Sequence, residues 1–187
     1  MILRRYPQED ASPGLREAIL ALEDTAWPPE PGAPAPWPGD IGTYLTSFVL
    51  LDGGEAAAHA AVRRRVIRHG GEEYAAYGLS EVVVRPGSRR QGLGLQIIRA
   101  AAAFIGEQRP DVSLFTCKPE LTGFYGKAGW EVLPGACLVG GTREKPFRSD
   151  ALGLAVMARF YSEKAVRRRA DFAGAEIWLE IAEGELW

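Results

Sequence analysis

Cysteine and histidine are scarce in this chain. Its 187 residues include two of each, namely Cys117, Cys137, His59 and His69. Two cysteines do not make the disulfide framework of a small secreted protein, and so few nitrogen and sulfur ligands argue against a metal site. We therefore expect a reducing, cytoplasmic setting and no bound metal.

Long apolar runs and an excess of either charge are also absent. Lys plus Arg number 22 and Asp plus Glu number 24, which leaves a net charge of −2. A protein devoted to coating nucleic acid usually carries a strong basic excess. No segment approaches the ~20 apolar residues of a membrane span, and residues 1–10 lack the apolar core of a signal peptide. We expect no nucleic-acid partner, no membrane insertion and no secretion.

Hydrophobic residues, at 47%, are sufficient for the core of one domain, and no internal repeat is visible. Turns such as Asp52-Gly53-Gly54 and His69-Gly70-Gly71 separate apolar runs. The patterns predict strands at 2–6, 47–51, 56–66, 74–84, 112–116, 130–133, 152–160 and 176–181, and helices from 13, at 92–107 and at 120–127. Strands followed by strand–helix–strand indicate an α/β or α+β fold, a mixed sheet with helices packed on it.

Six prolines stand between Trp27 and Asp40. They exclude a helix or a central strand from this segment. Trp27 and Trp37 bracket most of it, and large aromatic residues in such a loop more often pack than dangle. We interpret the segment as a rigid surface loop, either lining a site or acting as plain filler.

The segment that ends the 74–84 strand carries the clearest functional pattern. A Pro-Gly turn follows the β-branched strand end, and a loop rich in Arg and Gly leads directly into a helix. Glycines leave backbone N–H groups uncovered, and the helix N-terminus and arginines add positive charge, so the segment suits a pyrophosphate. The residues that give it these properties are Arg89, Arg90, Gly92 and Gly94.

Two common phosphate motifs do not fit this loop. It has no lysine for a Walker sequence, and the third glycine of a dinucleotide fingerprint is replaced by Ile97. The pattern Arg89-x-x-Gly92-x-Gly94 instead resembles the coenzyme A loop of the GCN5-related N-acetyltransferases (GNAT family). The resemblance implies that the coenzyme is bound by Val82, Val83, Val84, Arg89, Arg90, Gln91, Gly92, Leu93, Gly94 and Leu95. The alternative is a glycine-rich helix start with exposed arginines.

A second segment strengthens the resemblance. Phe124-Tyr125-Gly126 and Gly129-Trp130 are similar to the short helix and Gly-aromatic pair that follow in that family. The resemblance implies a sheet that is mostly antiparallel and splayed between its fourth and fifth strands, with pantetheine of acetyl-CoA in the gap. It also implies that Tyr125 reprotonates the departing thiolate, a nearly balanced transfer because tyrosine and thiol pKa values are close. The alternative is a core tyrosine.

A narrower resemblance concerns the third strand and the tail. Ala58-His59-Ala60-Ala61-Val62 and the acidic, Trp-terminated end at Trp187 are similar to aminoglycoside 2'-N-acetyltransferases. In that subgroup an acidic site binds the cationic acceptor. The resemblance implies acceptor roles for the Trp187 carboxylate, for Asp150 and, with a looser alignment, for Asp40. The broader GNAT resemblance covers about residues 1–160, which we expect to form the core of one domain, with 161–187 as its C-terminal strand and tail.

The subgroup's fourth-strand glutamate has no simple counterpart here. Counting from His59, its position falls on Ser80, and Glu81 comes one residue later. Side chains alternate along a strand, so Glu81 faces the same way only if the strand carries a bulge. The resemblance thus makes Ser80 an acceptor-site residue and Glu81 a candidate base. Gly78 stands where histone acetyltransferases place their glutamate, which argues against that chemistry.

The resulting hypothesis is direct acetyl transfer from acetyl-CoA to a small cationic amine, an aminoglycoside or aminosugar first. Glu81, or Asp150 through water, would deprotonate the amine. Alternatives are another acceptor (a polyamine, an amino acid or a protein N-terminus) or an acyl-CoA sensor without turnover. Cys117 is interpreted as a buried structural residue, His59 as a core histidine and Arg63-Arg64-Arg65 as a solvated face. Homodimers are common in the family, so a homodimer remains open.

Overall fold

The structure is a computed structural model that describes residues 1–29, 37 and 43–187. Most of the proline-rich segment, including Asp40, lies outside these residues. At its described positions, Trp27 is exposed, whereas Trp37 packs against a small core cluster under the first helix. None of the described helices is both long enough and apolar enough to cross a membrane.

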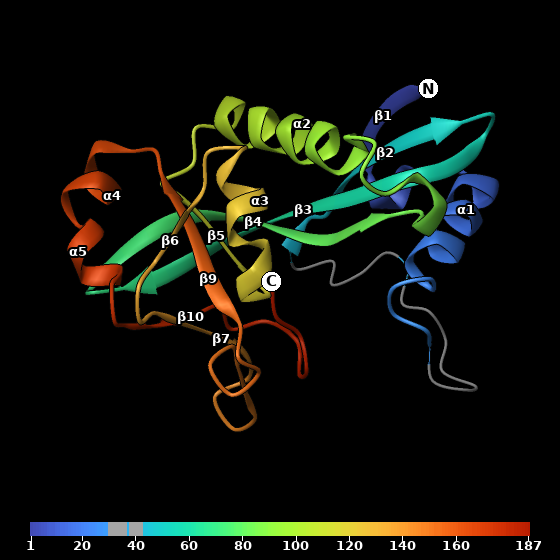
Figure 1. The fold of residues 1–187 in the computed structure, drawn as a ribbon. Helices are drawn as coiled ribbons and strands as arrows, with labels where there is room; N and C mark the ends of the chain where they lie inside the picture. Colours follow the sequence, from blue (N-terminus) through green and yellow to red (C-terminus); the bar gives the residue numbers. More distant parts are fainter. Residues whose placement is uncertain (30–36, 38–42) are drawn as a thin grey trace.

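A seven-stranded sheet organises the chain (Figure 1). Its pairs are antiparallel except β4 with β5, which is parallel. A smaller sheet of three strands, in the order β10-β7-β8, lies beside it. The strands of the large sheet, in spatial order, are β1 (Ile2–Pro7), β2 (Thr46–Asp52), β3 (Glu55–His69), β4 (Glu72–Val84), β5 (Val112–Cys117), β9 (Ala155–Phe160) and β6 (Glu131–Val132). Those of the small sheet are β10 (Glu176–Trp178), β7 (Cys137–Gly141) and β8 (Pro146–Arg148).

Two helices cover opposite faces of β2, β3 and β4. Helix α1 (Pro13–Glu23) buries Ile19 against Val49 and its neighbours, whereas α2 (Leu93–Glu107) packs on the face that carries Phe48. The adjacent β2 residues Phe48 and Val49 therefore pack into different core clusters on opposite faces of the sheet, because side chains alternate along a strand. The other helices are α3 (Thr122–Gly126), α4 (Glu163–Arg167) and α5 (Arg169–Phe172), and short 3-10 turns occupy Gln8–Asp10, Pro86–Ser88 and Pro119–Leu121.

The predicted fold class is confirmed: a mixed, mostly antiparallel sheet is flanked by helices. The sequence did not predict β7, β8, α4 or α5. These elements have three to five residues each, too few to show a period. Ser12 precedes α1 as expected, but its side chain makes no capping hydrogen bond.

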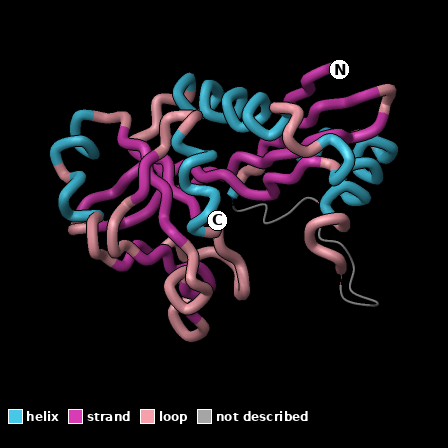
Figure 2. Tube along the Cα trace, viewed as in Figure 1, coloured by secondary structure: helices cyan, strands magenta, loops and turns pink. Residues whose placement is uncertain are grey.

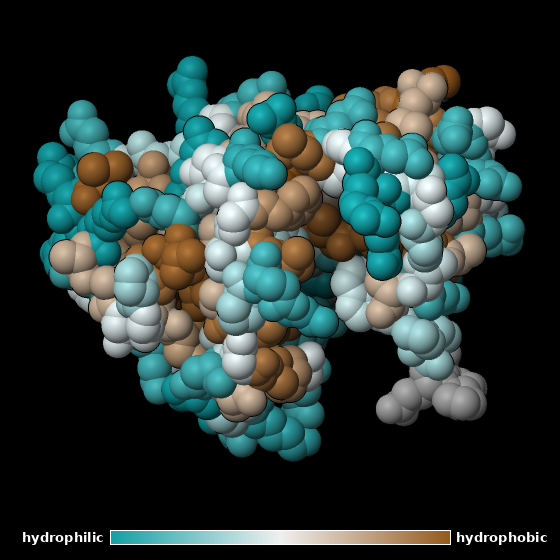
Figure 3. Space-filling model, in the orientation of Figure 1, coloured by the Kyte–Doolittle hydropathy of each residue, from teal (hydrophilic) through white to brown (hydrophobic). Residues whose placement is uncertain are grey.

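The last residues of the chain are irregular and return to the centre of the molecule (Figure 2). Trp187, the final residue, is almost fully buried and belongs to the main core. The space-filling view shows the surface hollowed near the C-terminus, between the end that carries α1 and the body that carries α4 and α5 (Figure 3).

Candidate active site

Strands β4 and β5 separate after a short parallel contact. They pair only at Ala76 with Val112 and at Tyr77 with Ser113. Beyond these pairs β4 continues to Val84 and β5 to Cys117. The predicted splay between the fourth and fifth strands is therefore present. Beyond these pairs, backbone N–H and C=O groups on this side of β4 make no hydrogen bonds to β5. Such groups need other hydrogen-bond partners.

The loop after β4 presents its backbone to solvent at the start of α2. Gly92 adopts a φ of 85°, and a Cβ placed there would meet nothing within 4 Å. Among the described residues no side chain caps this helix end, so its first N–H groups are available to a ligand. Arg89, Arg90 and Gln91 are exposed around it. The described loop thus has the properties of an anion cradle.

Close packing explains why position 94 is a glycine. A Cβ there would lie 3.2 Å from the ring of Phe124 and 3.4 Å from Val84 Cγ2. The absence of a side chain thus lets α2, α3 and the end of β4 approach closely. This contact positions α3, which carries Tyr125, against the loop.

A β-bulge occurs in β4 beside the splay. His59 pairs with Val83 and Ala61 pairs with Ser80, so two β4 residues, Glu81 and Val82, oppose one β3 residue. Glu81 has a φ of 55°, a left-handed conformation that is uncommon for a residue with a side chain. The bulge is the condition under which Glu81 faces the same side of the sheet as Ser80, and the structure has it.

Arg63 shows the effect of the bulge on the side chains. Its Nε donates to Ser80 Oγ at 3.0 Å, and its Nη2 lies 3.3 Å from Glu81 Oε1. One guanidinium therefore reaches two consecutive side chains of β4, which would point to opposite faces in a regular strand. Arg63 is 5% exposed, so the interpretation of the arginine run as a solvated face was wrong at this position.

Tyr125 is buried against β5. Its ring makes edge contacts with Phe115 and Phe124, with centroids 4.8 and 5.0 Å away. Burial, and to a smaller extent the nearby Cys117, raises the pKa of the Tyr125 phenol above 10. The phenol is therefore protonated at neutral pH and able to donate. The same setting suits either a core aromatic or an acid facing the splay.

Trp187 lies in the opening between β4 and β5. A Cβ at Gly78 would overlap the Trp187 indole and the Leu114 carbonyl. The main-chain oxygen of Trp187 accepts a hydrogen bond from Thr116 N at 2.8 Å and another from the Thr116 hydroxyl. The main chain of Trp187 is thus fixed along β5, at the position where the strands have separated.

Glu185 joins the site through the same tail. Its carboxylate accepts from Arg63 Nη1 at 2.8 Å, and its backbone passes so close to Gly140 that a Cβ there would not fit. Neither Glu185 nor Arg63 was predicted as a site residue from the sequence. Glu185 could have been selected because it is an acidic residue two positions before the predicted site residue Trp187. For Arg63 the sequence offered no indication beyond its charge.

Asp150 is placed differently. It follows β8, and both its oxygens accept from Arg148, at 2.8 and 3.0 Å. These hydrogen bonds from Arg148 lower the pKa of Asp150 to about 2. Among the described contacts, none joins Asp150 to Glu81, Ser80 or Trp187. Its predicted acceptor role stays a prediction, and so does that of Asp40.

Residues 17–133 match the sequence model of a family described as an acetyltransferase (GNAT) domain. The chain belongs to the GNAT acetyltransferase family. No curated protein matches it at a significant level.

Solved structures agree with this GNAT assignment. Escherichia coli ElaA superposes with a TM-score of 0.59 at 15% identity, over 84% of this chain and 98% of that chain. An acyl-CoA N-acyltransferase from Pseudomonas aeruginosa gives 0.59 at 18% identity, over 84% and 98%. A GNAT family acetyltransferase from Brucella melitensis, solved with acetyl-CoA, gives 0.52 at 20% identity, over 70% and 83%. At these identities the likeness shows the fold.

Proposed function

We propose that this GNAT protein transfers the acetyl group of acetyl-CoA to a small cationic amine, with aminoglycosides that carry a free 2'-amine as the first candidates. The observation that carries the proposal is the bulge, because it turns a carboxylate, Glu81, to the side of the sheet that Ser80 faces. An acid, a base and an anion cradle then surround one splay.

The chain's own residues fit the coenzyme. The uncapped N-terminus of α2 and the open backbone at Gly92 suit a pyrophosphate, with Arg89 and Arg90 adding charge. Backbone groups from Val82 to Val84, which β5 does not pair, suit an extended pantetheine. When bound, acetyl-CoA supplies an activated thioester that a free amine can attack.

Tyr125 would supply the acid. Burial keeps its phenol protonated and raises its pKa above that of a thiol, so the phenol holds a proton for the departing thiolate but the transfer is less balanced than the ordinary pKa values imply. Glu81 would supply the base. Burial raises the pKa of Glu81, while His59 and Arg63 oppose that rise, and a carboxylate with a raised pKa is the better proton acceptor from an ammonium.

The charges around the splay favour a cationic acceptor. Glu81 and Glu185 supply two negative charges, and Arg63 supplies one positive charge between them. A net negative site attracts ammonium groups and repels acidic acceptors. The Trp-terminated tail and the third strand make an aminosugar the preferred member of this class.

Thiol release from acetyl-CoA by the purified protein tests the proposal. We expect release with an aminoglycoside that has a 2'-amine and none with a matched aminoglycoside that has a 2'-hydroxyl. Release only with a polyamine, an amino acid or a peptide N-terminus would support an acetyltransferase but contradict the proposed aminoglycoside acceptor. Tight acetyl-CoA binding in calorimetry without release for any amine would favour a sensor and contradict the proposal.

Tyr125→Phe tests the assigned acid. The substitution removes only the phenolic proton donor, so we expect kcat to fall about 10²-fold or more while acetyl-CoA affinity changes less than about twofold. Tyr44→Phe is the matched control, because Tyr44 is 62% exposed, and its rate should match the parent. Equal rates in both variants would remove Tyr125 from catalysis.

A further inference from the structure

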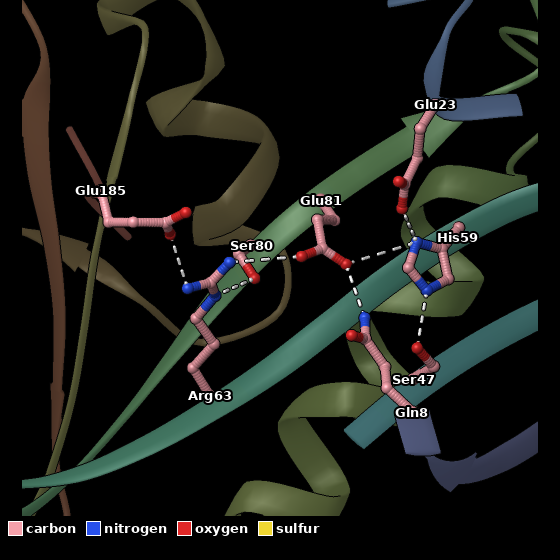
Figure 4. A network of polar contacts seen from close by, with 8 residues as sticks. All are labelled: Gln8, Glu23, Ser47, His59, Arg63, Ser80, Glu81 and Glu185. Carbon is pink, nitrogen blue, oxygen red and sulfur yellow. Dashed lines mark hydrogen bonds and ion pairs between the residues drawn. The ribbon is translucent and has the colours of Figure 1, made fainter. Parts of the chain in front are cut away.

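Three side chains from separate elements point toward one another beside the splay (Figure 4). Glu23 ends α1, His59 lies in β3 and Glu81 lies at the bulge of β4. His59 Nδ1 is 2.8 Å from Glu23 Oε1 and 4.0 Å from Glu81 Oε2. One nitrogen or oxygen of each residue lies within 4.8 Å of the other two. The fold therefore gathers one imidazole and two carboxylates around one small volume.

Two of these atoms are buried without a hydrogen-bond partner. Among the described residues, neither His59 Nδ1 nor Glu23 Oε1 makes a hydrogen bond. Only 2.8 Å separates them, but the contact does not have hydrogen-bond geometry, and the His59 side chain is fully buried. A buried polar atom without a partner costs free energy, and such atoms are few in native structures. A ligand that both atoms contact would remove this cost.

The charges around these atoms favour a cation. Glu23, Glu81 and Glu185 carry three carboxylates, whereas Arg63, which contacts the last two, supplies one positive charge. Two negative charges therefore remain around a neutral imidazole. Glu23 also ends a helix whose last turn contains no basic residue, and the partial negative charge of a helix C-terminus repels a carboxylate. A divalent cation would offset both.

The hydrogen bonds of the neighbours leave lone pairs for an ion. His59 Nε2 and Ser47 Oγ form a hydrogen bond of 2.9 Å. A ring that donates its Nε2 proton to Ser47 presents the lone pair of Nδ1 to the two carboxylates, and histidines that bind metals almost always donate their other N–H in this way. Gln8 Nε2 donates to Glu81 Oε2 at 2.8 Å, which holds this carboxylate and leaves the oxygen a second lone pair.

The separations suit the bond lengths of a transition-metal ion. Metal bonds of roughly 2.0–2.2 Å place two ligands of one ion at most about 4.4 Å apart. Both distances from His59 Nδ1 lie below this limit, and the whole set, within 4.8 Å, needs only a small side-chain rotation. The side chains of Glu23 and Glu81 are 16% and 21% exposed, so an ion can enter from solvent.

We propose that Glu23, His59 and Glu81 bind one divalent transition-metal ion, for which Zn²⁺ is the probe. Imidazole suits Zn²⁺ and similar ions, whereas Mg²⁺ and Ca²⁺ prefer oxygen ligands alone. Three protein ligands leave a further position open to water. The scarcity of histidine in the sequence is no obstacle, because this ligand set needs only one.

A proton shared between His59 Nδ1 and Glu23 is the competing occupant. It would satisfy the same two atoms, but their contact lacks the geometry of a hydrogen bond. The Arg63 guanidinium does not oppose the metal ion strongly. It stands 3.3 Å from Glu81 Oε1, which is the oxygen directed away from His59, and it is also paired with Glu185 at 2.8 Å.

Zn²⁺ binding by the metal-free protein, measured by isothermal titration calorimetry, tests the site. We expect one Zn²⁺ per chain, a melting temperature raised by about 5 °C or more at saturation, and much weaker binding of Mg²⁺. Glu23→Gln and His59→Gln should each weaken Zn²⁺ binding about tenfold or more. Glu23→Gln keeps the shape of a partly exposed side chain, so its result is decisive even if the buried His59→Gln variant does not fold.

Two variants outside the cluster are the matched controls. Glu163→Gln, at an acid whose side chain is 90% exposed, and His69→Gln should bind Zn²⁺ as the parent does. Zn²⁺ affinity that is unchanged in Glu23→Gln, or that falls equally in these controls, would overturn the proposal. Equal affinity for Mg²⁺ and Zn²⁺ would overturn the assigned class of metal.

A spectroscopic readout identifies the ligand atom without any turnover. In His69→Gln the sole histidine is His59, so a long-range ¹H–¹⁵N spectrum reports its two nitrogens. We expect equimolar Zn²⁺ to shift the Nδ1 signal and to leave the proton on Nε2. A proton that stays on Nδ1 at saturating Zn²⁺ would identify the shared proton as the occupant and overturn the proposal.

The metal site does not depend on the proposed acetyl transfer, and the two can fail separately. If Glu81 is the base, a metal ion on its Oε2 makes it a poorer proton acceptor. We then expect Zn²⁺ to lower kcat about tenfold or more in the parent and less in Glu23→Gln, and a chelator to restore it. An undiminished rate in the Zn²⁺-loaded parent would contradict the role of Glu81 as base, whereas absent Zn²⁺ binding would overturn the metal site alone.

Discussion

At the scale of single residues, Glu81 reaches the side of Ser80 because the backbone of β4 bulges there, with a left-handed φ of 55° at Glu81. Ser80 and Glu81 could be selected from the sequence, and a bulge could be named as the condition for Glu81. The bulge itself depends on a left-handed φ at Glu81, which no residue-level preference indicates. Gln8 reaches Glu81, and Glu23 reaches the neighbouring His59, only through tertiary packing, so these contacts could not be predicted.

Cys117 illustrates a residue whose reactivity the structure constrains. Burial, with a smaller contribution from Glu120, raises the pKa of the Cys117 thiol to about 11. Only the thiolate reacts, so at pH 8 iodoacetamide should label Cys117 about 100-fold more slowly than in the unfolded chain. The native rate, followed by peptide mass spectrometry, should climb as the pH rises towards 11.

Activity of Cys117→Ser completes this test. We expect acetyl transfer within about threefold of the parent, because the thiol is not a nucleophile in the proposed direct transfer. Rapid labelling at pH 8, together with loss of turnover in the serine variant, would indicate an acetyl-thioester intermediate on Cys117 instead.

At the scale of elements, long periodic segments were predictable and short ones were not. The pattern over 92–107 located α2 to within one residue, and the β-branched run located the end of β4 at Val84. Strand β7 contains two glycines in five residues, and β8 has three residues. Such segments become strands because neighbours pair with them, and their own sequence carries no period that shows it.

The loop before α2 yields an element-scale prediction. Gly92→Ala forces a side chain into a φ of 85°, which costs roughly 1 kcal/mol, so the loop should relax away from the cradle. We expect acetyl-CoA to bind about fivefold or more weakly in calorimetry. Gly87→Ala, in the same loop with open space and no positive φ, should bind as the parent does; equal weakening in both would show that the cradle does not depend on Gly92.

At the scale of the whole molecule, the end of the chain holds the two sheets together. The tail passes Gly140 of the small sheet and then enters the splay of the large sheet at Gly78. A resemblance could indicate that Trp187 matters, but only the fold shows it as part of the main core. The described tail thereby links the stability of the molecule to the shape of its candidate site.

Trp187→Ala should therefore destabilise the entire fold. Removing a 3% exposed indole from between β4 and β5 should lower the free energy of unfolding by about 3–5 kcal/mol, measured by urea denaturation. Trp27→Ala, at a side chain that is 54% exposed, should stay within about 0.5 kcal/mol of the parent. The β4–β5 pairing at Ala76 and Tyr77 lies next to the indole, so exchange of its amide hydrogens should quicken in Trp187→Ala. Unchanged stability would mean that the tail lies on the sheet without supporting it, and the splay would then owe its shape to α2 and α3 alone.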